Sequence, residues 1–280
     1  MNRITIAVCS MLFLGSLQWL SARVAPVAVA PGVLRTGVII EPEVTESSGL
    51  VASRRFSGVF WTHNDHGQSP KLFAISREGG TIGKFKVTGA AISDWEDISI
   101  DGAGNLYIAD IGNNEFNRDE VQIYRIVEPN PRGAGSVRVT RSWHLKYPNQ
   151  PKDCEAFIVH GNFGYLISKQ RKDNLVEMFR FPLSATTRVT LQSLGKIRVV
   201  GDVTGGAISR DAQSLALITE KGAYVYRING NPLAVLRIRG YFTPFDNPQM
   251  EGASFAGNGL LVTGEDGQLF LFNSAPFRSQ

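Results

Sequence analysis

Short apolar runs separated by polar turns make up most of the chain. After residue 30, no window holds apolar residues at helical spacing for three turns, and runs with apolar alternation recur instead, bounded by Gly, Asn, Asp and Pro. This pattern is typical of β-strands and turns and predicts an all-β fold. Strands are expected at residues 33–40, 58–63, 71–76, 82–87, 105–111, 121–127, 137–146, 164–169, 175–181, 196–200, 214–220, 223–228, 233–238 and 268–273.

Five short segments resemble one another and indicate an internal repeat. Their second positions follow at intervals of 48, 59, 49 and 47 residues: Ser48, Glu96, Glu155, Thr204 and Glu251. A four-stranded propeller blade needs about 40–50 residues, so the repeat predicts a five-bladed β-propeller with four strands per blade. A β-sandwich is the alternative, but it does not require five similar starts at near-equal spacing.

The two ends of the chain complement each other. The last unit begins at Met250 and has room for only three strands, whereas residues 33–40 form a strand that no other unit needs. If the N-terminal strand closes the last blade, two open sheet edges disappear, and open edges favour aggregation. We therefore expect residues 31–280 to form one propeller domain closed by its N-terminal strand.

The first 30 residues have a different pattern. Arg3 precedes a largely apolar stretch over residues 4–20, and small residues follow, with Ala28 and Ala30 in an A-x-A arrangement before Pro31. This order is that of a secretory signal peptide; an uncleaved N-terminal anchor is the alternative. The leader predicts an exported protein, periplasmic or secreted, with membrane contact only through this segment.

Charge and cysteine content argue against a nucleic-acid partner and against a disulfide-stabilised fold. The net charge of +4 includes Arg3 and Arg23, and without them 27 basic side chains face 25 acidic ones, so we expect no nucleic-acid partner. Cys154 is the only cysteine after the leader, which excludes an intramolecular disulfide. A monomer stabilised by its apolar core is expected, with a buried and inert thiol.

The repeat places five side chains on one ring. The first strand of each propeller blade lines the central channel, so equivalent positions face one axis at one height. Three carboxylates converging there would repel one another unless a cation or protons neutralise them. Oxygen ligands suit calcium better than zinc. We therefore predict a divalent cation, calcium, at Ser48, Glu96, Glu155, Thr204 and Glu251. The alternative is that the glutamates accept hydrogen bonds from backbone amides and hold the blades together.

A second set of polar residues follows the second strands. These residues are expected around one mouth of the channel, on loops over a rigid scaffold, where ligand sites concentrate; taken singly, Asn and Asp are common turn formers. The set predicts a small-molecule or protein ligand there, with Asp65 and Asp110 as candidate catalytic bases. The remaining candidate ligand-binding residues are His63, Asn64, Asn113, Lys169, Arg171, Glu220 and Glu265.

Other chemistries are weakly indicated. His63 and His66 form a His-x-x-His pair, but it lies in a turn without a third ligand at a repeat position. No Gly-x-Ser-x-Gly motif occurs. Trp61, Trp95 and Trp143 are expected to pack in the core rather than to present sugar platforms.

Several motifs resemble those of a widespread family of exported bacterial β-propeller proteins that mostly lack an assigned activity. The motifs are Trp-Thr-His-Asn-Asp at 61–65, Asp-Trp-Glu-Asp-Ile at 94–98, Leu-Tyr-Ile-Ala-Asp-Ile-Gly-Asn-Asn at 106–114 and Val-Thr-Gly at 203–205. The resemblance covers roughly residues 45–275 and implies the fold and the exported location.

A looser resemblance is to the five-bladed calcium-activated nucleotidases, or apyrases. Their inner strands carry a Ser, Glu, Glu, Ser, Glu series around a central calcium, which is similar to the ring here with Thr204 in place of the second Ser. Their first blade continues into an Asp-rich turn of the active site, where Asn64 and Asp65 would fall. This chain lacks their long insertions, so the resemblance implies calcium more than nucleotide hydrolysis. The six-bladed gluconolactonases also hold a metal with an inner-strand Glu followed by Gly, as in Glu251-Gly252.

Three hypotheses follow from the sequence. The first is a calcium-stabilised binding or scaffolding propeller with its ligand at the mouth. The second is a metal-dependent hydrolase of a phosphoanhydride, phosphoester or lactone, in which the metal polarises the substrate and orients a water, and Lys169 or Arg171 meets an anionic group. The third is an interaction module that uses the outer blade edges, which a contiguous apolar patch would favour.

Overall fold

The computed structural model describes residues 25–67, 69–133, 135–169, 173–257 and 259–277. These residues form strands joined by turns, with two short 3-10 helices and no α-helix among them. Within the same residues, no helix has the length and hydropathy needed to cross a bilayer. The prediction of an all-β fold is confirmed.

The first half of the chain builds two antiparallel meanders. The first consists of β3 (Ser47–Ala52), β4 (Val59–Asn64), β5 (Lys71–Ser76) and β6 (Thr81–Thr88), and the second of β7 (Trp95–Ile100), β8 (Asn105–Asp110), β9 (Glu120–Val127) and β10 (Gly135–Lys146). The outer strands β6 and β10 pair in parallel, Gly135 with Phe85 through Arg138 with Thr88, so the meanders share one hydrogen-bonded sheet. The strand β14 (Arg188–Thr190) pairs with the other end of β10.

The next two sheets have four strands each. One contains β11 (Cys154–His160), β12 (Phe163–Ser168), β13 (Leu175–Pro182) and β15 (Gln192–Arg198). The other contains β16 (Val203–Ile208), β17 (Ser214–Thr219), β18 (Gly222–Arg227) and β19 (Tyr241–Pro244). Consecutive strands in each sheet pair antiparallel, as expected for strands joined by short turns.

The predicted strand at residues 233–238 is wrong. The segment is a 3-10 helix, η1 (Pro232–Leu236), and the outer strand of this sheet is β19 instead. Pro232 stands in the first turn, where its missing N–H is not needed, and the Asn231 side chain accepts a hydrogen bond from the Leu233 amide. These local signals start a helix in a sequence whose apolar residues also suit a strand.

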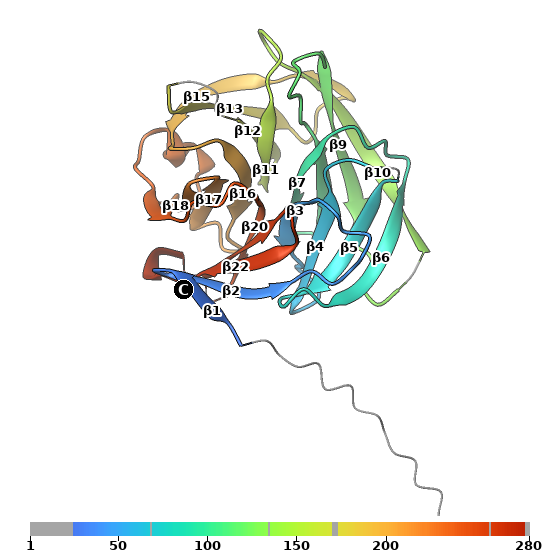
Figure 1. The fold of residues 1–280 in the computed structure, drawn as a ribbon. Helices are drawn as coiled ribbons and strands as arrows, with labels where there is room; N and C mark the ends of the chain where they lie inside the picture. The colour runs from blue at the N-terminus through green and yellow to red at the C-terminus, as the bar shows by residue number, and fades with distance from the viewer. Residues whose placement is uncertain (1–24, 68, 134, 170–172, 258, 278–280) are drawn as a thin grey trace, which may run out of the picture.

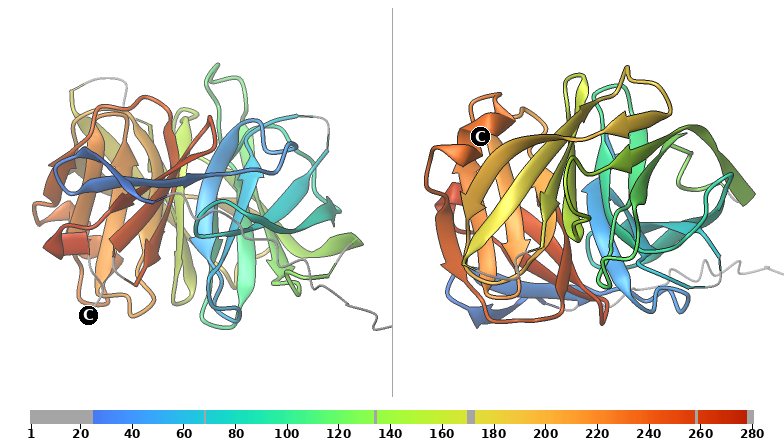
Figure 2. Two further views of the ribbon diagram at one scale, coloured as in Figure 1. Left: turned by 60° about the horizontal axis from the view of Figure 1, so that its bottom comes forward. Right: turned by 90° about the horizontal axis from the view of Figure 1, so that it is seen from above.

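The last sheet joins the two ends of the chain. The C-terminal strands β20 (Met250–Ala256), β21 (Gly259–Gly264) and β22 (Gln268–Phe272) continue into β2 (Val33–Val38) and then β1 (Val27–Ala30). The pairing of β2 with β22 is the closure expected from the sequence, and Figure 2 shows β2, in dark blue, on the outside of the C-terminal strands. The helix η2 (Ala275–Phe277) follows and buries Phe277.

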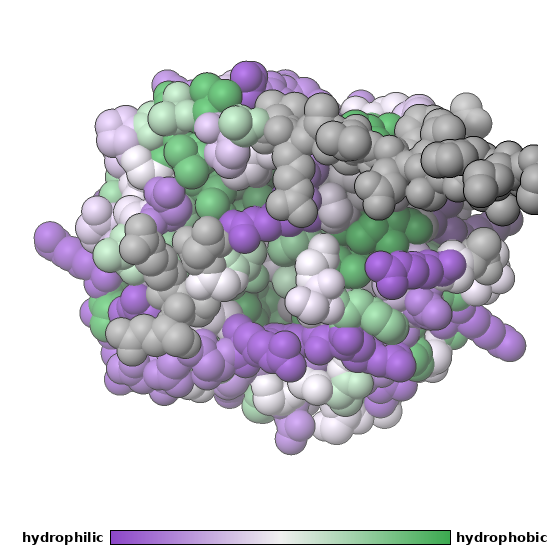
Figure 3. Space-filling model, turned by 90° about the horizontal axis from the view of Figure 1, so that it is seen from below, coloured by the Kyte–Doolittle hydropathy of each residue, from purple (hydrophilic) through white to green (hydrophobic). Residues whose placement is uncertain are grey.

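The strand β1 leaves an edge open among the described strands. It pairs with β2 alone, and it includes residues 27–30, on the leader side of the boundary expected from the sequence. Val27 and Val29 on this edge are 45% and 41% exposed. Figure 3 shows this side of the molecule, where hydrophobic surface in green is bordered by hydrophilic residues in purple.

The sheets stand radially around one axis (Figure 1), so the fold is a β-propeller rather than a sandwich of two facing sheets. The first strand of each meander lies innermost, and each inner strand packs against its two neighbours in the cyclic order β3, β7, β11, β16, β20. Apolar clusters fill the space between adjacent meanders all the way around. Trp61, Trp95 and Trp143 are fully buried in these clusters, which confirms their expected packing role.

Candidate metal centre at one mouth of the channel

The same irregularity occurs in every inner strand. Each inner strand contains a β-bulge near its start, where it has one residue more than the second strand that pairs with it. Bulges re-aim side chains and are frequent beside functional sites. In four inner strands the extra residue is a member of the predicted ring, Glu96, Glu155, Thr204 or Glu251, and in β3 it is Gly49, directly after Ser48. The repeat seen in the sequence is therefore a repeat of bulges.

Side chains of this ring open into a small acidic cavity of about 80 Å³. Among the described residues, seven carboxyl groups and one lysine line it. Such a space admits a few water-sized groups. The lining residues are Glu46, Ser48, Asp65, Asp94, Glu96, Asn114, Glu155, Lys169, Glu251 and Glu265.

The closest group of carboxylates is Glu96, Asp153 and Glu155. One ligand atom from each lies within 4.8 Å of the other two, and all three residues are buried. Glu96 and Glu155 were predicted from the repeat, whereas Asp153 was not, although it lies directly before β11 as Asp94 lies directly before β7. Oxygen donors this close in a buried site can hold a hard divalent cation.

The electrostatics of the pair favours proton or cation uptake. Burial raises the pKa of Glu96 well above its usual value, and the charges of Glu155 and Asp94 raise it further. Burial also raises the pKa of Glu155, to about 7, against the opposing effect of Lys169. The two carboxyl groups also form a hydrogen bond with each other, which requires one of them to be protonated. These shifts are those expected of carboxylates that share a desolvated space without a cation.

Lys169 lines the acidic cavity and pairs with one of its buried carboxylates. Its Nζ donates to Oε1 of Glu155 at 2.8 Å, and its side chain is only 23% exposed. Burial lowers its pKa, but the charge and hydrogen bond of Glu155 outweigh this and leave the pKa raised. An ammonium thus supplies part of the positive charge that the acidic cavity requires.

The other three ring residues differ in their contacts. Glu251 lines the cavity, and its carboxylate has no hydrogen-bond or ion-pair partner among the described residues; burial and then Glu155 raise its pKa well above the usual value. Ser48 Oγ donates to the Glu96 carbonyl at 2.7 Å and so links β3 to β7. Thr204 is buried, but its hydroxyl lacks a partner and it does not line the cavity.

Asp97 performs the blade-linking role that the sequence offered to the glutamates. Its buried carboxylate accepts from the Ile98 and Phe157 amides at 2.8 Å and from the Gly206 amide at 3.2 Å. These donors lie on β7, β11 and β16, so one side chain ties three inner strands together across the axis. Burial raises the pKa of Asp97, and the three amides oppose that effect.

Glycines allow the inner strands to approach closely beside Asp97. A Cβ on Gly252 would lie 2.5 Å from the Gly49 carbonyl carbon, and a Cβ on Gly49 would lie 2.8 Å from the Ile98 amide nitrogen. A side chain at either position would force the strands apart, since real Cβ atoms do not come that close to backbone. Gly49, Asp97 and Gly252 therefore form a packed layer beneath the acidic cavity.

Besides Lys169, two of the predicted mouth residues line the acidic cavity, Asp65 and Glu265. Asp65 is 23% exposed and accepts from His66 Nδ1 at 2.7 Å and from the His66 amide at 2.6 Å. Glu265 lies beside it, and burial together with Asp65 and Glu46 raises the Glu265 pKa. Glu46, Asp65 and His66 form a second, more exposed group whose ligand atoms lie within 4.8 Å of one another.

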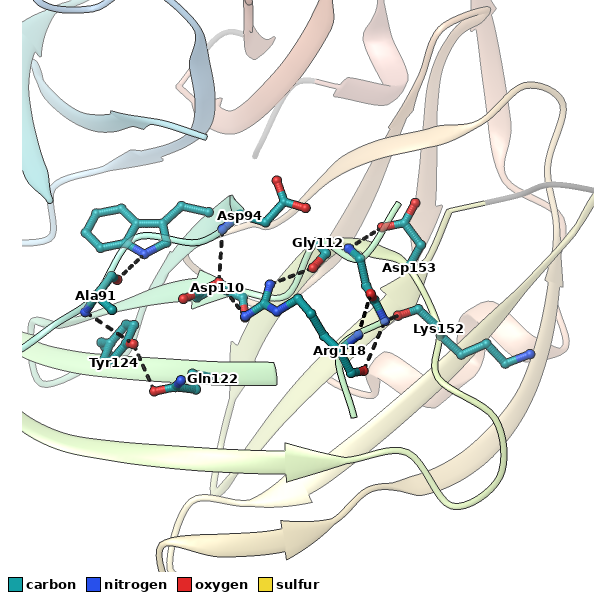
Figure 4. Close-up of polar contacts among 11 residues, drawn as sticks. Ala91, Asp94, Asp110, Gly112, Arg118, Gln122, Tyr124, Lys152 and Asp153 are labelled. Atoms are coloured by element: carbon teal, nitrogen blue, oxygen red, sulfur yellow. Dashed lines mark hydrogen bonds and ion pairs between the residues drawn. The ribbon is translucent and has the colours of Figure 1, made fainter. Parts of the chain in front are cut away.

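Asp110 has a structural environment rather than that of a free base (Figure 4). Its carboxylate is fully buried and accepts from Arg118 at 2.7 Å and from the Asp94 amide at 3.1 Å. Arg118 also donates to the Gly112 carbonyl at 2.6 Å. Burial raises the pKa of Asp110, with the Arg118 guanidinium opposing it. The pair fixes the loop after β8, and Asp110 does not line the acidic cavity.

Asn113 holds the same loop. Its backbone N–H donates to Asp153 Oδ1 at 2.8 Å (Figure 4). Its side chain forms hydrogen bonds with the main chain of Arg118 and Lys152. Asn113 thereby orients one of the carboxylates of the tight group. It supports the centre from behind instead of facing a ligand at the mouth.

Three further mouth candidates are not at the cavity. His63 is completely buried, stacks edge-on against Trp95 at 5.5 Å, and has a pKa lowered to about 4 because burial disfavours its charge. Asn64 bonds the main chain of residues 43–46 and shapes a turn. Glu220 lies outside the cavity lining, 3.7 Å from Lys221. Arg171 lies outside the described residues.

The buried thiol of Cys154 is free, and burial raises its pKa, which fits the predicted inert cysteine.

Comparisons with known proteins add little beyond the fold. No model of a known protein family matches the chain, and no curated protein matches it. A chain of the mitotic checkpoint complex is similar at 14% identity and a TM-score of 0.41, over 80% of this chain and 60% of that one. The Neurospora crassa Pan2 WD40 domain is similar at 11% identity and a TM-score of 0.41, over 88% of this chain and 98% of that one. A putative gluconolactonase is similar at 14% identity and a TM-score of 0.45, over 84% of this chain and 76% of that one.

This chain spans only 60% of the checkpoint-complex chain. At such identities and TM-scores, the matches decide neither the number of blades nor an activity. The propeller assignment stands on the sheet topology described above.

Proposed function

We propose that the chain is an exported five-bladed β-propeller that holds a divalent cation, calcium, in the acidic cavity and acts as a ligand-binding or scaffolding protein. The five-blade count is supported by the cyclic order of β3, β7, β11, β16 and β20 and by an apolar cluster between each neighbouring pair of meanders. In this view the shared sheet of β3–β10 is two blades joined at their outer strands. The exported location follows from the leader predicted at residues 1–30.

The observation that carries the cation proposal is the convergence of Glu96, Asp153 and Glu155 within 4.8 Å of one another, beside a cavity whose seven carboxyl groups include Glu96 and Glu155. Two unit charges about 4 Å apart interact by about 4 kcal/mol at an effective dielectric constant of about 20, so these groups repel strongly when ionised. Lys169 offsets one negative charge of these three carboxylates, which leaves two when all three are ionised. A divalent cation would balance the remaining negative charge and let the carboxylates ionise at neutral pH.

Calcium fits the donor set better than zinc or magnesium. The donors are oxygens from carboxylates, a serine hydroxyl and waters, with no histidine or cysteine sulfur lining the cavity among the described residues. Calcium accepts six to eight such ligands in irregular geometry, whereas magnesium demands a near-ideal octahedron. The residues that would hold the ion are Ser48, Glu96, Asp153, Glu155 and Glu251; Thr204 of the predicted ring does not line the cavity.

The ligand would approach from the solvent side of this cavity. Asp65 and Glu265 stand at its rim, and both are acidic, which favours a cationic or metal-bridged ligand and disfavours nucleic acid. A small molecule or a protein segment meets these requirements. A monomer suffices, because one chain supplies all the residues of the site.

A metal-dependent hydrolase is a second candidate, favoured by one observation. Asp65 is partly exposed and lines the same cavity as the carboxylates that would hold the ion. A cation there would polarise a phosphoryl or lactone oxygen at the mouth, and Asp65 would take a proton from the attacking water. Asp110 is unsuited to that role because Arg118 and the Asp94 amide engage its buried carboxylate.

Metal analysis and calorimetry test the cation proposal. The purified protein should contain about one calcium per chain and lose it to a chelator. Saturating calcium at 100 times Kd adds about 2.7 kcal/mol of stability, which raises Tm by roughly 5–10 °C in a domain of this size. Glu96→Gln should weaken calcium binding at least tenfold, whereas Glu115→Gln, at an exposed residue outside the cavity, should not change it. Equal affinities in the two variants would refute the site.

Hydrolysis assays on the same samples separate the two functions. A nucleoside triphosphate, a phosphomonoester and a lactone are the substrates to supply with calcium. Activity that Asp65→Asn abolishes while calcium still binds would establish the hydrolase. No turnover of any of these substrates by a calcium-loaded protein would favour the binding or scaffolding role.

A further inference from the structure

A second and much larger cavity lies at the opposite end of the inner strands. Its volume is about 770 Å³, within the range of about 300–1,000 Å³ that is typical of small-molecule sites. The later residues of β3, β7, β16 and β20 form its walls, and residues 53–55 and 57–58 form its rim. The layer of Gly49, Asp97 and Gly252 separates it from the acidic cavity, because the residue before each of them lines the acidic cavity and the residue after each of them lines this one.

Part of the lining of this cavity is apolar. Leu50, Phe60, Ile98 and Ile100 line it, each is at most 4% exposed, and we call these four residues the floor. The serines in the lining already have roles: Ser99 Oγ accepts from the Val159 amide at 3.0 Å, and Ser254 Oγ accepts from the Ala52 amide at 2.8 Å. An apolar body therefore fits the floor better than a polar one.

The charges of the lining are almost entirely positive. Four arginines line the cavity, Arg54, Arg55, Arg77 and Arg210, against one acid, Asp211. The Asp211 carboxylate is already engaged, since it accepts from Ser209 Oγ at 2.6 Å and from the Gln213 amide at 3.0 Å. Arg55 donates to the Glu128 carbonyl at 3.2 Å and lies 5.4 Å from the centre of the Phe56 ring.

Arg54 and Arg210 line the cavity without a hydrogen bond or an ion pair to any residue in the described parts of the chain. Arg54 is partly buried, with its Nε donor buried and unpaired, whereas Arg210 is exposed. Burial lowers the pKa of the Arg54 guanidinium and the neighbouring Arg210 lowers it further, while Asp101 and Glu128 act in the opposite direction without pairing to it. A guanidinium remains charged in proteins, so two like charges face one space.

We propose that this cavity binds a small organic anion, with its apolar body against the Leu50–Phe60–Ile98 floor and its carboxylate or phosphate between Arg54 and Arg210. Guanidinium groups match the geometry of carboxylate and phosphate oxygens, and an oxyanion would satisfy the unpaired donor of Arg54. This site is independent of the cation centre at the other mouth. The molecule would then carry a cation at one end of its channel and an anionic ligand at the other.

A fluorescent probe tests the proposal on the full chain. The probe 8-anilinonaphthalene-1-sulfonate combines an apolar ring system with a sulfonate, and we expect one molecule to bind per chain. Arg54→Gln combined with Arg210→Gln should weaken its binding at least tenfold. Arg239→Gln removes the same charge from an exposed residue outside the cavity and should have no effect.

Competition identifies the class of the natural ligand. Octanoate should displace the probe, whereas 1-octanol, which has the same chain without the charge, should not; octyl phosphate compared with octanoate distinguishes phosphate from carboxylate recognition. Equal displacement by 1-octanol, or equal probe affinity in the double variant and the unsubstituted protein, would overturn the proposal.

The double variant should have an equal or higher Tm without ligand, because it relieves repulsion between two arginines, so misfolding will not hide the result. A lower Tm would show that the arginines stabilise the fold and would also overturn the assignment.

Discussion

The ammonium of Lys169 donates to Oε1 of Glu155 at 2.8 Å, and both residues line the acidic cavity. Glu155 also lies within 4.8 Å of Glu96 and Asp153, measured between carboxylate oxygens. In the proposed calcium site, the lysine would compete with the metal ion for this carboxylate.

Replacement of Lys169 by Gln should strengthen calcium binding. The change removes a positive charge from the edge of the site and frees Glu155 Oε1, and interactions between charges at this distance are worth several kcal/mol at intermediate dielectric. We expect the Kd for calcium to fall about tenfold or more, measured by calorimetry at pH 7.5. Lys152→Gln is the matched control, because Lys152 pairs with Glu177 outside the cavity. If Lys169→Gln instead weakens calcium binding, the lysine is a support for the ring and not a competitor.

Stability without metal should fall as the pH rises. The pKa of Glu155 is about 7 in the folded protein and 4.5 as its ordinary value, and the pKa values of Glu96 and Glu251 are raised as well. The folded state thus binds more protons than the unfolded state over this interval, so the stabilisation is complete below about pH 4.5 and is lost as the pH rises through 7. At about 1.4 kcal/mol per pKa unit, the Glu155 contribution is on the order of 3 kcal/mol.

Thermal melts in chelator between pH 4.5 and 8 measure this effect. Tm should decrease over the range in the unsubstituted protein and decrease less in Glu155→Gln, which does not titrate. Saturating calcium should remove or reverse the trend, because the ion favours the ionised carboxylates. A Tm that is independent of pH in chelator would show that the carboxylates are better solvated than the structure indicates.

The size of the acidic cavity depends on Gly112. A Cβ at this position would overlap Oε1 of Glu96 and the carboxylate of Asp94, and the backbone of Gly112 does not require glycine on conformational grounds. Gly112→Ala should therefore displace both carboxylates and weaken calcium binding at least tenfold while leaving every charge in place. Gly102→Ala is the control, since nothing lies within 4 Å of a Cβ there. Unchanged calcium affinity in Gly112→Ala would place the ion away from Glu96.

The sequence predicted most of the strands because their pattern is local. Apolar alternation and turn residues placed strands at 71–76 and 105–111, and the structure has them at Lys71–Ser76 and Asn105–Asp110. The error at 233–238 arose where apolar content alone favoured a strand, although Asn231 and Pro232 carried a visible helix-start signal. The parallel pairing of β6 with β10 depends on how two meanders meet and leaves no local pattern.

The candidate site was predicted only in part from the repeat. Glu96 and Glu155 stand at equivalent positions and were found; Asp153, which stands two residues before Glu155 as Asp94 stands before Glu96, was missed because only the second position of each repeat was aligned. Burial separated residues that look alike in sequence: Asp65 lines the cavity, whereas Asp110 pairs with Arg118 and His63 lies in the core. The larger cavity, lined by Arg54 and Arg210, combines residues from four inner strands and the rim. These residues come together only because the meanders close around one axis.

Asp97 should be among the most sensitive positions in the fold. Its carboxylate accepts three backbone amides from three inner strands, and Asn at this position offers only one acceptor oxygen and turns an N–H₂ group toward amide donors. Because hydrogen bonds to charged groups are worth about 1.5–3 kcal/mol each, we expect Asp97→Asn to cost about 2–4 kcal/mol. That loss lowers Tm by roughly 5–15 °C for a domain of this size. Asp101→Asn is the control, since its carboxylate also accepts backbone amides but lies in a partly exposed turn; it should cost less than about 1 kcal/mol.

Calcium affinity should survive Asp97→Asn, because this residue does not line the acidic cavity. A small change in Tm would mean that the inner strands are held mainly by apolar packing, and a loss of calcium affinity in a folded variant would mean that the layer beneath the cavity also positions the ring.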